Sequence, residues 1–159
     1  MEMALGEAKI AFEAGEFPVG CVIVHENKII ANGRRNNSNT DTNELDHAEM
    51  VAFRQLLITH KGIATDEITV YSTMEPCLMC FSTLLVNGVK NFVYSYEDVM
   101  GGGTNLPLKN LAPLYSEMKI SVTKKVLREK SVELFKRFFS SPELDYLQGT
   151  LLATYTLKQ

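Results

Sequence analysis

One histidine and two cysteines in this 159-residue chain have the spacing of metal ligands. His47 is followed thirty positions later by Cys77, and Cys80 completes a C-x-x-C pair. A histidine nitrogen and two thiolates suit Zn²⁺, which is usually bound by four ligands in a tetrahedron. Because three protein ligands leave the fourth position open to water, the set predicts a catalytic site with one Zn²⁺ per chain. The expected chemistry is hydrolysis.

Glu49 lies two positions after His47 and is the candidate for proton transfer. Two thiolates cancel the formal charge of Zn²⁺, so such a site acidifies its water less than an all-histidine site would. A nearby base is therefore useful. We expect Glu49 to accept a proton from the water and deliver it to the substrate, first as a base and then as an acid.

Apolar and β-branched patterns place both halves of this site at helix starts, where unpaired N–H groups favour thiolates over thiols. His47 and Glu49 lie in the first turn of a predicted helix that has Asp46 or Thr42 as its cap. A further helix begins at Cys77 after a strand. The predicted helices cover residues 4–12, 48–57, 77–87, 126–139 and 144–157; the strands cover 19–24, 28–31, 68–73, 91–95 and 119–122; a polar loop covers 33–44. The alternation predicts a layered α/β domain.

Composition restricts the class of protein. With 45% apolar residues, residues 1–159 suffice for one domain, in which 142–159 form a C-terminal helical extension. The formal charge of −3 gives no global basic field for nucleic acid. The sequence contains neither a signal-peptide pattern nor a run of apolar residues long enough to span a membrane. Three cysteines, two of them in C-x-x-C, fit metal ligation in a reducing, cytoplasmic compartment.

Two other interpretations of the cysteines remain open. A closed structural zinc site would need a fourth ligand, for which Cys21, His25 and His60 are the candidates. A thioredoxin-type redox pair would leave His47 and Glu49 without a role.

The motifs His47-Ala48-Glu49 and Pro76-Cys77-x-x-Cys80 resemble the H-x-E and P-C-x-x-C signature of zinc-dependent nucleobase and nucleoside deaminases. In that superfamily an activated water attacks the carbon bearing an exocyclic amine, the glutamate protonates a ring nitrogen, and ammonia leaves. The resemblance implies that His47, Cys77 and Cys80 hold zinc and that Glu49 is the proton shuttle. It also implies a three-layer α/β/α cytidine-deaminase-like fold with a five-stranded mixed sheet, and a homodimer.

Further matches are typical of tRNA adenosine deaminases. Residues 16–20 resemble the E-x-P-V-G segment of that group, and residues 73–77 resemble its T-x-E-P-C. Asn36, eleven positions before His47, matches an asparagine that contacts the base or ribose, and the Ala48 backbone N–H would contact substrate by the same analogy. Asp46 is a candidate either for a helix cap or for a contact to a substrate amine. The resemblance implies conversion of adenosine to inosine in tRNA.

Two segments depart from that group. Residues 97–105 lack the lysine of its D-x-K-x-G-A-x-G-[ST] segment, and residues 138–142 lack its C-terminal arginines. Cationic phosphate contacts supply much of the affinity for nucleic acid. A deaminase of a free base, nucleoside or nucleotide, such as cytosine or guanine, is therefore an alternative. Residues 142–147 also resemble the C-terminal helix of small zinc cytosine deaminases. A non-catalytic subunit that uses zinc to present RNA or a partner is the second alternative.

Overall fold

A five-stranded mixed sheet organises the computed structural model, which describes residues 1–39 and 43–159. The strand order is β2-β1-β3-β4-β5. β1 pairs antiparallel with β2 and β3, whereas β3–β4 and β4–β5 are parallel. The strands are β1 (Gly20–His25), β2 (Lys28–Arg34), β3 (Thr69–Met74), β4 (Asn91–Tyr96) and β5 (Ser121–Thr123). The predicted five-stranded mixed sheet is confirmed.

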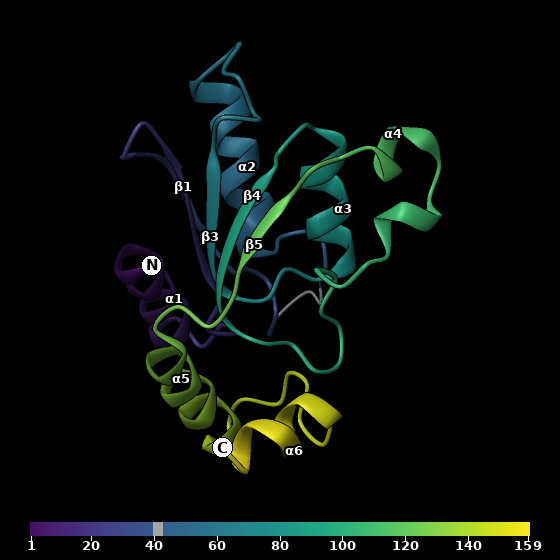
Figure 1. The fold of residues 1–159 in the computed structure, drawn as a ribbon. Helices are drawn as coiled ribbons and strands as arrows, with labels where there is room; N and C mark the ends of the chain where they lie inside the picture. Colours follow the sequence, from purple (N-terminus) through teal and green to yellow (C-terminus); the bar gives the residue numbers. More distant parts are fainter. Residues whose placement is uncertain (40–42) are drawn as a thin grey trace.

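Helices cover both faces of this sheet, which gives the predicted three layers (Figure 1). α2 (Ala48–Thr59) and α3 (Leu78–Val86) form one layer, and α1 (Glu2–Glu13) and α5 (Arg128–Ser140) form the other. Two glycines permit close helix packing: a Cβ at Gly20 would lie 2.2 Å from a backbone oxygen of α1, and one at Gly33 would lie 2.5 Å from backbone atoms of α2. Because both faces are covered, β1 is a continuous buried run at Gly20–Ile23.

The start of α2 differs from the prediction in its cap. His47 itself occupies the N-cap position, with Glu49 as the second helical residue. The Asp46 carboxylate instead accepts hydrogen bonds from Asn37, Asn43 and Arg54. The alternative cap, Thr42, lies outside the described residues. The placement of His47 and Glu49 at the helix start is confirmed.

The predicted helix over residues 144–157 is wrong in its first half. α6 covers only Leu151–Leu157, and turns and irregular backbone precede it. Leu147 and Gly149 have φ values of 59° and 73°, which a right-handed helix does not allow. The Thr150 hydroxyl then accepts a hydrogen bond from the Ala153 N–H and caps the new helix.

Two short elements join β4 to β5: a 3₁₀ turn at Leu108–Asn110 and α4 at Pro113–Ser116. Neither was predicted, because three or four residues are too few to show helical periodicity. Within the described ranges, the helices are all too short or too polar to cross a membrane.

Candidate active site

Two helix starts bring the three predicted metal ligands together. His47 lies at the N-cap of α2, Cys77 lies at the N-cap of α3, and Cys80 follows in the first turn of α3. The Nδ1 atom of His47 is 3.5 Å from the Sγ atom of each cysteine, and the three donor atoms all lie within 4.8 Å of one another. These atoms surround a space suited to one ion.

The donor set fits Zn²⁺ chemically. A hydrogen bond from Cys80 lowers the pKa of Cys77 to about 4, so one sulfur is a thiolate without any metal. The same contact, together with burial, raises the pKa of Cys80. The pair thus shares one proton, which Zn²⁺ would replace.

The candidates for a fourth protein ligand lie elsewhere. Cys21 is buried in β1, His25 contacts Glu67, and His60 contacts Thr59. Across residues 1–39 and 43–159, no other histidine, cysteine or carboxylate joins the His47, Cys77 and Cys80 group. The open coordination position expected of a catalytic site is therefore preserved.

Glu49 is almost fully buried beside these ligands, with 3% of its surface exposed. Its Oε1 atom accepts a hydrogen bond of 2.9 Å from the Ser72 hydroxyl on β3. Burial raises the pKa of Glu49, partly opposed by the positive charge of His47. A carboxylate with a raised pKa can accept a proton and give it back near neutral pH.

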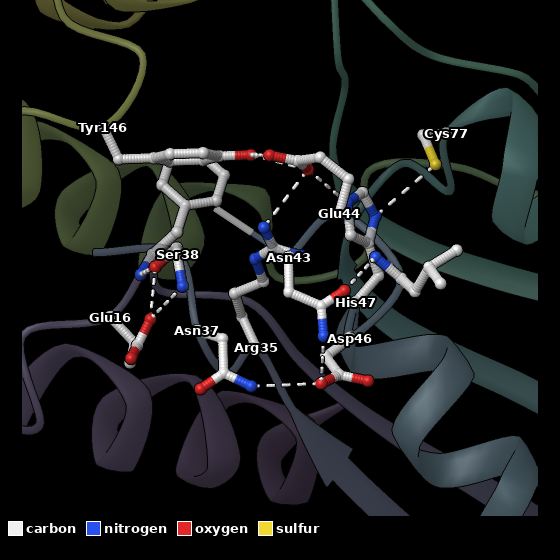
Figure 2. A network of polar contacts seen from close by, with 12 residues as sticks. Glu16, Arg35, Asn37, Ser38, Asn43, Glu44, Asp46, His47, Cys77 and Tyr146 are labelled. Carbon is white, nitrogen blue, oxygen red and sulfur yellow. Dashed lines mark hydrogen bonds and ion pairs between the residues drawn. The ribbon is translucent and has the colours of Figure 1, made fainter. Parts of the chain in front are cut away.

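The second nitrogen of His47 contacts a carboxylate that sequence reasoning missed. The Oε2 atom of Glu44 lies 3.1 Å from His47 Nε2 and 3.1 Å from Arg35 Nη2, and the Tyr146 hydroxyl lies 3.0 Å away (Figure 2). Burial would raise the pKa of Glu44, but the hydrogen bond from His47 and the charge of Arg35 lower it. Glu44 is therefore ionised and only accepts, so His47 Nε2 carries a hydrogen and Nδ1 is the nitrogen that can bind the metal once its own proton has left.

A cavity of about 270 Å³ opens beside the predicted metal ligands. His47, Ala48, Glu49 and Cys77 line it, and Tyr146, Leu147 and Leu152 of the C-terminal segment form another part of the wall. A planar heterocyclic base is of a size that such a cavity can accept.

A sequence profile of the cytidine and deoxycytidylate deaminase zinc-binding region matches residues 1–96. The chain belongs to this family. As a member of it, the protein is a zinc-dependent hydrolytic deaminase, which confirms the predicted cofactor and reaction class.

Relatives of this deaminase extend the likeness over most of its length. The tRNA-specific adenosine deaminase of Rickettsia typhi is 33% identical over 142 residues, covering 87% of this chain and 95% of the relative. The tRNA-specific adenosine deaminase 2 of Xenopus tropicalis is 33% identical over 149 residues, covering 87% of this chain and 86% of the relative. The predicted closeness to tRNA adenosine deaminases is thus confirmed.

Solved structures share the deaminase fold. One comes from a study of A-to-I editing by tRNA:A34 deaminases at the wobble position; it is 25% identical, covers 84% of this chain and 96% of the other, and has a TM-score of 0.69. The guanine deaminase of Nitrosomonas europaea is 18% identical, covers 84% of this chain and 79% of the other, and has a TM-score of 0.64. At this low identity, the likeness shows a shared fold alone.

Only one of the three predicted substrate contacts of this deaminase is among the described residues that line the cavity. Ala48 lines the cavity, whereas Asn36 and Asp46 are not among the described residues that line it. The Asn36 N–H donates to the Asp46 carbonyl across 3.3 Å, and both support the loop before His47. Substrate contacts from Asn36, Ala48 and Asp46 stay predictions.

Besides Glu44, two acidic residues in the cavity wall were not predicted as site residues. Glu75 is 5% exposed and accepts hydrogen bonds from the Asp98 N–H and the Thr104 hydroxyl. Burial raises the pKa of the neighbouring Asp98. The T-x-E-P-C match at Glu75 was the signal that could have indicated this wall. Asp98 gave no such signal, because it reaches the cavity through the loop after β4.

Proposed function

We propose that this deaminase converts adenosine to inosine in tRNA. The observation that carries the proposal is the relatedness to tRNA-specific adenosine deaminases from a bacterium and a frog over 87% of the chain. The His47-x-Glu49 motif beside a base-sized cavity is consistent with that substrate class. Residues 1–159 are proposed to form a single deaminase domain.

His47, Cys77 and Cys80 would hold the zinc, because their donor atoms converge from two helix starts. When bound, Zn²⁺ supplies an activated water as the nucleophile. Glu49 would accept one proton of that water and pass it to a ring nitrogen of the base, and would then pass the second proton, taken from the new hydroxyl group, to the leaving amine. A C–O bond forms, the exocyclic C–N bond breaks, and ammonia leaves. Asn36, Ala48 and Asp46 are the proposed substrate contacts.

The substrate is tested by incubating zinc-loaded protein with tRNA and, separately, with a panel of free bases, nucleosides and nucleotides. We expect inosine in tRNA and ammonia in equal amount, with the Glu49→Gln variant as the inactive control. Ammonia from the small molecules alone would contradict a tRNA substrate and favour the free-base or nucleoside alternative. Ammonia from neither would favour a non-catalytic subunit.

We further propose a homodimer in the cytoplasm. The outer surface of the α2 and α3 layer carries apolar side chains that are 46–72% exposed: Leu57, Ile58, Leu78 and Val86. Three free cysteines fit a reducing compartment. Light scattering after gel filtration should give twice the monomer mass of 17.8 kDa, and a mass of one chain would contradict the dimer.

A further inference from the structure

We propose that Glu44 is a positioning residue for the zinc ligand His47, and that Arg35 and Tyr146 hold it in place. The inference rests on the proposed zinc site. Glu44 accepts a hydrogen bond from His47 Nε2 at 3.1 Å, whereas both sulfurs lie beside Nδ1. Figure 2 shows Glu44 and Cys77 on opposite edges of the imidazole. The carboxylate therefore cannot reach the same ion as Nδ1, and its effect on the metal passes through the ring.

A carboxylate behind a metal-binding histidine has a defined physical effect. It fixes the tautomer and the ring orientation and makes the ligating nitrogen more basic, and its loss typically weakens metal affinity by about 10- to 100-fold. Such support matters because His47 is the N-cap of α2, where its backbone joins the helix only through its carbonyl, which accepts the Val51 N–H.

The Glu44 side chain is 56% exposed, yet His47, Arg35 and Tyr146 all restrain it. Arg35, only 2% exposed, ion-pairs with Oε2 at 3.1 Å. The Tyr146 hydroxyl donates to both carboxylate oxygens, at 3.1 and 3.0 Å, and the Tyr146 ring lies 5.5 Å from the Arg35 guanidinium. An exposed pair without such restraint contributes little. Tyr146, in the C-terminal segment, is 102 positions from Glu44 in the sequence and supports the metal ligand through it.

The chain contains a matched pair outside the site. His25 Nε2 and Glu67 Oε2 lie 3.2 Å apart, the same atoms at almost the same distance, but the Glu67 side chain is 66% exposed. In the described part of the chain, His25 is the single side chain that contacts the Glu67 carboxylate. Glu67→Ala therefore removes a histidine-bound carboxylate without touching the cysteines.

The experiment measures Zn²⁺ affinity by chelator competition, and the absorption spectrum of the Co²⁺-loaded protein, in full-length variants. We expect Glu44→Ala to weaken Zn²⁺ binding about 10- to 100-fold and to shift the Co²⁺ bands. Glu67→Ala should leave both unchanged. Glu44→Gln, which retains a carbonyl acceptor for His47 Nε2–H, should restore part of the affinity. Tyr146→Phe keeps the ring and should weaken binding about two- to tenfold, the effect of one hydrogen bond.

Unchanged affinity and an unchanged Co²⁺ spectrum in Glu44→Ala would overturn the proposal, as would an equal loss in Glu67→Ala. If Glu44→Ala does not fold, Tyr146→Phe and Glu44→Gln decide, and wild-type affinity in both would overturn it. None of these measurements uses a substrate, so a wrong tRNA assignment would leave them unaffected. Failure of the unsubstituted protein to bind Zn²⁺ would instead refute the zinc site itself.

Discussion

The Ser72 hydroxyl on β3 donates a hydrogen bond of 2.9 Å to Oε1 of Glu49 at the start of α2. Both residues are buried, so little water competes for this contact. Burial raises the pKa of Glu49, and the bond from Ser72 lowers it again by favouring the charged form. One strand residue therefore adjusts the proposed catalytic base.

Ser72→Ala should move the acidic limb of the pH profile for kcat/KM to higher pH. Glu49 must be ionised to accept a proton, and activity is lost as the pH falls through its raised pKa. Removing a bond that favours the ionised form raises that pKa further, by about half a unit to one unit. Ser95→Ala is the control, because Ser95 is equally buried on the neighbouring strand β4 and its hydroxyl has no partner among the described residues. A limb that moves in both variants, or in neither, would contradict the prediction.

Glu49→Gln should reduce turnover by at least about a hundredfold while zinc content stays near one per chain. The amide is almost the same size and still accepts from Ser72, but it cannot take a proton. Turnover is measured as inosine formation and zinc by elemental analysis of the same sample. Loss of zinc would make Glu49 a ligand, and full turnover would assign the proton transfer to another group.

Zinc affinity should rise with pH from about pH 6 to about pH 8. Burial alone would lower the pKa of His47, but the hydrogen bond with Cys77 and the charge of Glu49 raise it to about 9. The pKa of Cys80 is raised too, so His47 Nδ1 and Cys80 both carry protons at neutral pH in the apoprotein. Zn²⁺ must displace both, and each released proton makes the affinity about tenfold stronger per pH unit. Cys77, with a pKa of about 4, is already a thiolate and releases none.

Chelator competition across this pH range gives the slope, and calorimetry in buffers of different ionisation enthalpy counts the released protons independently. A flat dependence between about pH 6 and about pH 8 would show that the ligands are already deprotonated in the apoprotein, contrary to the raised pKa values of His47 and Cys80.

The metal ligands could be predicted from sequence because their geometry is local. Cys77 and Cys80 are three positions apart on one helix, and His47 precedes a second helix whose apolar stripe is readable. The strands were readable for the same reason, as short β-branched runs between turn residues. The meeting of the two helix starts followed from the ligands of a single Zn²⁺, whereas the three layers and the five-stranded mixed sheet were implied by the family resemblance.

The support around His47 could not be predicted in this way. Glu44 contacts Tyr146 only because the chain after α5 turns back over the cavity instead of continuing as a helix. That path depends on positive φ at Leu147, a residue type that rarely adopts it, and on the cap at Thr150. Apolar periodicity alone predicts one helix over residues 144–157, and Tyr146 was therefore not assigned to the site.

Glu97→Gln should lower the free energy of unfolding by about 1–3 kcal/mol near pH 7. Glu97 follows β4 and accepts hydrogen bonds from Arg128 at 2.8 and 2.6 Å and from the Tyr155 hydroxyl at 2.7 Å, so it joins α5 and α6 to the sheet. The bond from Arg128 lowers the pKa of Glu97 from 4.5 to about 2. A lowered pKa stabilises the fold above about pH 4.5, and this stabilisation is lost as the pH falls toward about 2. Urea unfolding should therefore show a difference between variant and wild type that shrinks across this range.

Glu129→Gln is the matched control. Glu129 faces the same Arg128 at 3.6 Å but is 86% exposed, so its loss should change the free energy of unfolding by less than about 0.5 kcal/mol. Equal losses in the two variants would show that solvent screens both pairs alike, and that the Glu97 carboxylate does not hold α6 to the sheet.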